Sequence, residues 1–119
     1  MGDRAPDFDP ATLSEMAAGL SRESLVPILG TFIEESRRRV EEVRAALAEG
    51  DLSRIELHAH SLKSTAATFG APALQAHALA LERAAAEANS AAASLLAGQL
   101  PAIAESAMTA VETWVAESD

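Results

Sequence analysis

The sequence contains no cysteine and very few aromatic residues, and both absences restrict the class of protein. Without cysteine there is no disulfide framework and no thiolate metal site. Aromatic residues make up only 3% of the chain, the residues that favour strands are scarce, and alanine is abundant. This composition predicts an all-α protein in which small side chains let helices approach closely.

Long apolar runs are also absent. No segment approaches the length of a membrane span, and the first residues lack the apolar stretch of a secretion signal. We therefore expect a cytoplasmic protein. At 119 residues the chain can form one hydrophobic core, so we expect a tail over residues 1–8 and a single helical bundle domain over residues 9–117. No apolar stripe is left over for self-association, which favours a monomer.

Positive charge is in short supply. The net charge is −9, which argues against a nucleic acid partner because phosphate binding needs a basic surface. The one basic run is Arg37, Arg38 and Arg39. Glu34 and Glu35 precede Arg38 and Arg39 by four residues, so a solvated helix face with ion pairs between successive turns explains this run better than a binding patch.

Glycine occurs only at isolated positions. The six glycines form neither of the two glycine-rich loops that hold nucleotide phosphates, the P-loop and the dinucleotide-binding turn. We therefore expect no ATP site and no autokinase activity.

Capping residues and prolines divide the chain into helices. Asp9 before Pro10 predicts a short helix over residues 10–19. The next helix has two candidate caps, Ser21 and Ser24. Ser24 is favoured, because Pro27 then falls in the first turn, where proline is tolerated.

Four longer helices follow, separated by Gly50-Asp51, by Gly70 before Pro72, and by a break at Asn89-Ser90. Each has an apolar stripe at steps of three and four residues. The predicted stripes are Leu25, Leu29, Phe32, Val40, Val43 and Leu47; Leu52, Ile55, Ala59, Leu62, Ala66 and Phe69; Leu74, Ala78, Leu81 and Ala85, with Ala88 as a further candidate; and Leu96, Leu100, Ile103, Ala107, Ala110 and Trp114.

Pro101 lies inside the last of these patterns, so we expect a kink there or a later start of that helix. Amphipathic helices joined by short connections predict an antiparallel four-helix bundle with a short additional N-terminal helix.

His60 is the most informative residue in this pattern. It lies one position from the stripe residue Ala59, about 100° around the helix, and should therefore flank the core and face water. Lys63, Ser64 and Ala67 share its face. An imidazole with a cation one turn away and small neighbours is open to a bulky anionic partner. A solvated histidine beside an ordinary surface lysine explains these residues equally well.

A longer motif around His60 resembles the histidine-containing phosphotransfer (HPt) family of two-component phosphorelays. The matching residues are Ala59-His60-Ser61-Leu62-Lys63-Ser64, the segment from Ala66 to Ala71, Leu74, Leu81-Glu82, Gly50-Asp51 and Phe32. The motif lies on the third of five predicted helices, as in the family. Ser64 departs from the pattern, which most often has glycine there to leave room for the partner.

The resemblance implies three roles at the site. His60 would be the phosphoacceptor, which agrees with the nucleophilicity of a neutral imidazole near pH 7. Lys63 would stabilise the charge of the phosphoryl group. Glu82 would accept a hydrogen bond from Nδ1–H of His60, fixing the ring orientation and leaving Nε2 free to attack; the alternative is a surface glutamate.

The resemblance also implies partners and a mechanism. The partners would be response-regulator receiver domains, and one of these could be the receiver of a hybrid histidine kinase. They would dock over Ser64, Ala67 and Gly70. Phosphoryl groups would pass reversibly from the aspartate of one receiver to His60 and on to a second receiver. This chain would bind no cofactor, and the receiver would supply Mg²⁺.

Rival interpretations remain open. A non-catalytic receiver-docking or helical adaptor module is one, and a phosphatase using Ser61 or Ser64 is another. The other histidines predict no metal site, because none has a glutamate three residues before it. We expect His58 to be a solvent-facing or inter-helix polar residue. For His77 a partly exposed structural role is favoured over a place on the partner surface.

Overall fold

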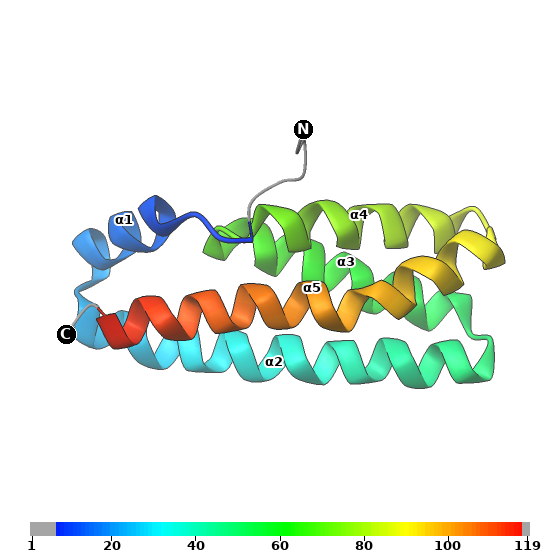
Figure 1. The fold of residues 1–119 in the computed structure, drawn as a ribbon, viewed down its shortest axis with the longest axis horizontal. Coiled ribbons are helices and arrows are strands. Elements are labelled where there is room, and N and C mark those ends of the chain that lie inside the picture. The colour runs from blue at the N-terminus through cyan, green and yellow to red at the C-terminus, as the bar shows by residue number, and fades with distance from the viewer. Residues whose placement is uncertain (1–6, 118–119) are drawn as a thin grey trace.

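The computed structural model describes residues 7–117 and contains, over that range, helices and no strand. The helices are α1 (Pro10–Leu20), α2 (Arg22–Glu49), α3 (Leu52–Phe69), α4 (Pro72–Ala86) and α5 (Ser90–Glu117). Figure 1 shows α2, α3, α4 and α5 running side by side along the molecule, with α1 beyond the α3–α4 turn. Sequential long helices pack against each other, and α5 returns to α2. The predicted antiparallel four-helix bundle with a short N-terminal helix is confirmed.

The start of α2 differs from the prediction. Ser21 caps the helix instead of Ser24: its hydroxyl accepts a hydrogen bond from the Ser24 backbone N–H at 3.2 Å. The N–H of Ser21 also donates to the carbonyl of Ala17 at 2.9 Å, so this one residue ends α1 and begins α2. Pro27 consequently lies inside the helix. Its missing N–H removes one hydrogen bond, and the caps that Ser21 provides offset that loss.

The ends of α3 agree with the prediction. The Asp51 carboxylate accepts a hydrogen bond from the N–H of Arg54 at 3.2 Å and caps the first turn. Gly50 and Gly70, which end α2 and α3, have φ values of 68° and 75°. Because side chains disfavour this left-handed region, glycine ends both helices sharply.

The predicted stripes of α2, α3 and α4 largely match the core, except for the further candidate Ala88, whereas the stripe of α5 needs correction. Ala88 is exposed, has a φ of 57° and lies after the end of α4. In α5 four predicted residues are only partly buried, namely Leu96, Ile103, Ala110 and Trp114. The buried residues of α5 are mostly alanines and are Ala93, Ala97, Leu100, Ala104, Ala107, Met108 and Val111. Alanine lets α5 approach its neighbours closely, which leaves the larger side chains at the margin of the contact.

Pro101 neither ends α5 nor delays its start, since the helix begins at Ser90. Figure 1 shows the first turns of α5, drawn in yellow, inclined toward α4 relative to the remainder, so the helix bends in the region that precedes the proline. None of the helices in the described part of the chain is long and apolar enough to span a membrane.

Candidate functional site

His60 projects from the solvent-facing side of α3. Its side chain is 59% exposed, while the preceding residue, Ala59, is completely buried. This contrast follows from the helical period, which turns successive side chains by about 100°. His60 is therefore held on a rigid element whose inner face is part of the core.

Two further side chains meet at His60. Glu82 reaches from α4, and its Oε2 lies 2.7 Å from Nδ1 of His60. The other oxygen, Oε1, accepts a hydrogen bond from Nζ of Lys63 at 2.6 Å. Glu82 is only 18% exposed, so both of its oxygens are directed to these donors in a largely enclosed position. The structure thus brings together the three residues that the motif singled out.

Small side chains on α3 and α4 make this approach possible. Ala59 and Ala66 on α3 and Ala78 and Ala85 on α4 are all buried. With no larger group between the helices at these positions, the backbones pack closely. Glu82 follows the fully buried Leu81 and flanks the core from α4, as His60 does from α3.

The electrostatics of the site favour an ionised Glu82. The hydrogen bond from Lys63 lowers the pKa of the Glu82 carboxyl most, and the contact with His60 lowers it further against the opposing effect of desolvation. A carboxylate can only accept, so Nδ1 of His60 carries the proton in this contact. The lone pair of the neutral ring then resides on Nε2. That nitrogen is the nucleophilic atom available at this surface.

A shallow hollow of about 330 Å³ lies beside the imidazole. His60 and Glu82 line it together with Ser53, Glu56 and Leu57 of α3. Leu57 is 59% exposed and lies one turn before His60. Leu57 is absent from the predicted site because it lies off the buried stripe. The signal for it in the sequence is an apolar residue outside that stripe, three positions before the histidine.

The three residues expected to contact a partner differ in accessibility. Ser64 and Ala67 are exposed on the His60 face of α3. Gly70 is buried, and a Cβ there would come within 2.7 Å of Cβ of Thr12. Its carbonyl accepts a hydrogen bond from the N–H of Asp9 at 2.7 Å. Gly70 therefore permits α1 to pack over the end of α3, and its expected place on a docking surface is wrong.

An apolar groove extends the exposed surface toward α2. It has a volume of about 300 Å³, and its lining includes the stacked rings of Phe32 and Phe69, whose centroids are 4.5 Å apart. Thr65 and the exposed Ile28 also line it.

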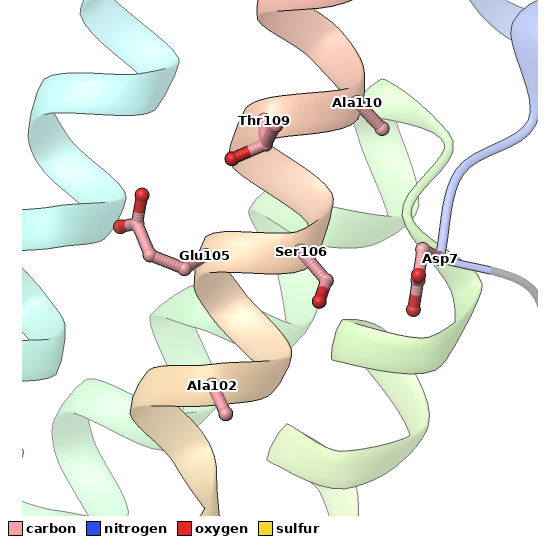
Figure 2. A pocket seen from close by; sticks show the side chains of 6 residues that line it. All are labelled: Asp7, Ala102, Glu105, Ser106, Thr109 and Ala110. Atoms are coloured by element: carbon pink, nitrogen blue, oxygen red, sulfur yellow. The ribbon is translucent and has the colours of Figure 1, made fainter.

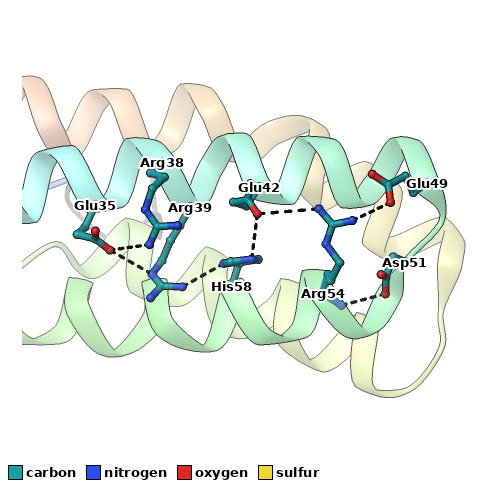
Figure 3. Close-up of polar contacts among 8 residues, drawn as sticks. All are labelled: Glu35, Arg38, Arg39, Glu42, Glu49, Asp51, Arg54 and His58. Atoms are coloured by element: carbon teal, nitrogen blue, oxygen red, sulfur yellow. Dashed lines mark hydrogen bonds and ion pairs between the residues drawn. The ribbon is translucent and has the colours of Figure 1, made fainter.

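His58 lies on the opposite side of α3 and is largely enclosed by charged residues of α2 (Figure 3). Its side chain is 11% exposed. Nη1 of Arg39 donates to Nδ1 of His58 at 3.0 Å, and Nε2 lies 3.7 Å from a Glu42 oxygen. Burial, and next the positive charge of Arg39, lower the pKa of His58. The expectation of an inter-helix polar residue is confirmed, and the solvent-facing alternative is wrong.

The basic run of α2 is paired, as expected, although not always with the expected partners. Arg38 and Arg39 both approach Glu35, at 2.8 and 4.0 Å. Arg37 instead reaches across to α5, where its guanidinium binds Glu105 at 2.8 Å and Glu112 at 3.4 Å. The charges of this run are thus matched by carboxylates within the bundle.

His77 has the structural role that the sequence favoured. Its Nε2 donates to the carbonyl of Leu96 at 2.7 Å and so links α4 to α5.

Another hollow lies along α5. Figure 2 shows its lining, which comes from α5 and from Asp7 before α1: Asp7, Ala102, Glu105, Ser106, Thr109 and Ala110. No histidine or cationic side chain is among these residues, and Glu105 is already bound to Arg37. Within residues 7–117 no cluster of three or more histidine or acidic side chains could hold a metal ion.

Comparison with known proteins gives two findings and one negative result. The family model described as "Hpt domain" matches residues 27–114. The crystal structure of histidine-containing phosphotransfer protein B (HptB) from Pseudomonas aeruginosa PAO1 superposes with a TM-score of 0.86 at 26% sequence identity, covering 95% of this chain and 97% of that protein. A comparison with curated protein sequences gave no match.

Proposed function

The chain belongs to the histidine-containing phosphotransfer family, whose members carry phosphoryl groups in two-component signalling, and we propose that His60 is the residue on which this one carries them. Proteins of this family exchange phosphoryl groups with receiver domains and are not kinases. The proposal adds the acceptor atom, the roles of its neighbours and a reversible passage from one receiver to another.

One observation carries the proposal. Nδ1 of the exposed His60 is engaged by Glu82 at 2.7 Å, which orients the ring and leaves Nε2 toward solvent. A ring held in this way can attack a phosphorus atom in line without first reorganising. Phosphoryl transfer depends mainly on such positioning together with charge stabilisation.

Lys63 supplies the charge in this proposal. Lys63 lies one helical turn from His60, and its side chain is 27% exposed. Lysine is a point charge on a flexible stem, so its head can follow a phosphoryl oxygen on Nε2 without repacking of the helix. Its contact with Glu82 holds it beside the ring before the phosphoryl group arrives.

The partner would cover the exposed part of α3. Ser64 and Ala67 leave space beside His60, and Leu57 offers an apolar contact on the same side. We propose that a receiver domain docks here as a complex with one copy of this chain and brings the Mg²⁺ that its own aspartate requires. In this scheme the chain has no ATP site, and a monomer in the cytoplasm remains our prediction.

The test is incubation with phosphorylated receiver domains. Phosphate should appear on the wild-type chain as an acid-labile, base-stable adduct, and the His60→Ala variant should acquire none. A second, unphosphorylated receiver should then remove the label. Docking of a receiver to wild type without any labelling would contradict the proposal and identify a non-catalytic docking module. Release of free phosphate without an adduct would indicate a phosphatase.

A further inference from the structure

Glu82 binds two donors at once, and this sharing has a consequence for the phosphorylated state. Its Oε2 faces Nδ1 of His60 at 2.7 Å, and its Oε1 faces Nζ of Lys63 at 2.6 Å. Orientation of the imidazole alone would need only one acceptor oxygen, which a glutamine could provide. The full negative charge and the second oxygen therefore call for a further explanation.

We propose that Glu82 retains the Nδ1 proton of His60 throughout transfer, so that the ring is carried as a phosphorylated cation, while Lys63 passes from Glu82 to the phosphoryl group. This inference rests on the proposed function.

The atoms and charges of the step balance with the proton left in place. As Nε2 attacks, the Nε2–P bond forms and the P–O bond to the receiver aspartate breaks, which releases that aspartate as a carboxylate. The ring, still protonated on Nδ1, becomes a cation beside the Glu82 carboxylate. In the onward step a second carboxylate attacks phosphorus, the N–P bond breaks, and neutral imidazole leaves with its original Nδ1–H.

The proton matters because it determines the leaving group. Without it, cleavage of the N–P bond would have to expel an imidazolide anion, which is a far poorer leaving group than neutral imidazole. An opposite charge within about 4–6 Å typically shifts a titration by about one to three pH units toward the charged form. A carboxylate in contact with Nδ1 therefore keeps the phosphorylated ring reactive across neutral and mildly alkaline pH.

Lys63 couples the arrival of the phosphoryl group to the retention of the Nδ1 proton. While it is bound to Glu82, it is the main group that lowers the pKa of that carboxyl. When the phosphoryl oxygens attract the ammonium group, Glu82 loses that partner and becomes a stronger acceptor for the Nδ1 proton. The carboxylate thus binds the proton more firmly at the stage where the ring carries the phosphoryl group.

Few other titratable groups face the ring in the described part of the chain. The hollow beside it is lined by Glu56 from α3 and Glu82 from α4, and Lys63 stands one turn away. Glu56 lies on the same face one turn before His60 and lines the same hollow, while Nδ1 of His60 is engaged by Glu82. Glu56→Gln is therefore a matched control, since it removes the same charge from the same hollow without touching Nδ1.

The test uses the full chain, phosphorylated on histidine with the small phosphodonor phosphoramidate. The titration of the phosphorylated ring is followed by ¹⁵N and ³¹P NMR in wild type, Glu82→Gln and Glu56→Gln. We expect the Nδ1 proton of Glu82→Gln to titrate at least about one pH unit below that of wild type, and Glu56→Gln to remain near wild type. Equal midpoints in wild type and Glu82→Gln would overturn the inference.

The onward rate separates this role from simple positioning. With a receiver as acceptor, the rate for Glu82→Gln should fall about tenfold per pH unit above its lowered midpoint, whereas wild type stays level to higher pH. Lys63→Gln should slow transfer at every pH and leave the ring protonated at least as firmly as in wild type. A uniform loss in Glu82→Gln with an unchanged pH profile would show that Glu82 only orients the ring. Failure of every variant, including wild type, to be labelled on histidine would instead remove the proposed function itself.

Discussion

His58 and His60 lie two residues apart on α3 and make opposite kinds of contact. Nδ1 of His60 faces a carboxylate, and its ring is 59% exposed. Nδ1 of His58 faces the Arg39 guanidinium, and its ring is 11% exposed. The carboxylate leaves the lone pair of His60 on the outward nitrogen, whereas the arginine occupies the lone pair of His58 and burial disfavours its cation. Which of the two rings presents a free lone pair to solvent is therefore set by the contacts from the neighbouring helices, and not by residue type.

The largest expected effect comes from removing each ring in turn. His60→Gln should reduce labelling by a phosphorylated receiver to background, and His58→Gln should leave it close to the wild-type level, because Nε2 of His58 is turned toward Glu42 inside the α2–α3 contact. Peptide mapping of the label provides the check. Label on His58 in the His60→Gln variant would contradict the inference that the contacts of His58 keep it from accepting a phosphoryl group.

The second test compares the buried and exposed faces through two leucines. Leu62 is 1% exposed and Leu57 is 59% exposed. Leu62→Ala should lower the free energy of unfolding by about 2–5 kcal/mol, since it opens a cavity in the core. Leu57→Ala should change it by no more than about 0.5 kcal/mol and instead weaken receiver binding. Urea unfolding and a binding titration measure these effects; a destabilisation of equal size in both variants would contradict the assignment of faces.

A third test uses the glycines that flank α3. Gly50 and Gly70 share a left-handed φ, but a Cβ at Gly50 meets nothing within 4 Å, whereas one at Gly70 would collide with Thr12. Gly50→Ala should cost about 1–2 kcal/mol from backbone strain alone. Gly70→Ala should cost more, because α1 must also shift. Thermal unfolding of both variants measures the difference in stability. An equal loss of stability in the two variants would mean that α1 can shift away from Gly70 without a measurable cost.

The smallest expected effect is a dependence of stability on pH. The pKa of His58 is lowered in the folded chain by burial and by Arg39, with Glu42 acting in the opposite sense and Arg38 and Arg54 adding to the lowering. The unfolded chain, with an ordinary histidine pKa near 6.5, takes up the proton first as pH falls. Stability should therefore decline below about pH 6.5 until the folded pKa is reached.

The His58→Gln variant is the control for that decline. It removes the titrating group, so its free energy of unfolding should vary less between about pH 6.5 and the onset of carboxylate protonation. Urea unfolding at a series of pH values provides the measurement. A slope that is the same in wild type and variant would assign the effect to another group.

Features that depend on neighbouring residues could be predicted from the sequence. The alternation of stripe and flank on α3 placed His60 outside and Ala59 inside, and Asp51 and Gly70 marked the two ends of the helix. These signals act over one or two helical turns, so a short stretch of sequence is enough to predict the ends and the buried face of the helix.

Features that depend on distant residues could not be predicted. The contact of His58 with Arg39 spans 19 residues, and that of Arg37 with Glu105 spans 68. No local spacing specifies which of several arginines reaches which carboxylate. The cap at Ser21 was missed for a different reason: the tolerance of Pro27 inside α2 depends on caps that only the joined helices form. The alanine-rich α5 offered two plausible inner faces, and packing selected one.

The short links between the helices have a consequence for how the chain folds. Gly50-Asp51 and Gly70-Ala71 are two-residue turns, and every long helix packs against the one that follows it. Most native contacts therefore join segments that are near neighbours along the chain, a topology associated with folding in microseconds to milliseconds. The bond from Asp9 to Gly70 is an exception that closes a long loop. We expect the α2–α5 bundle to assemble in the rapid phase and α1 to settle onto it last.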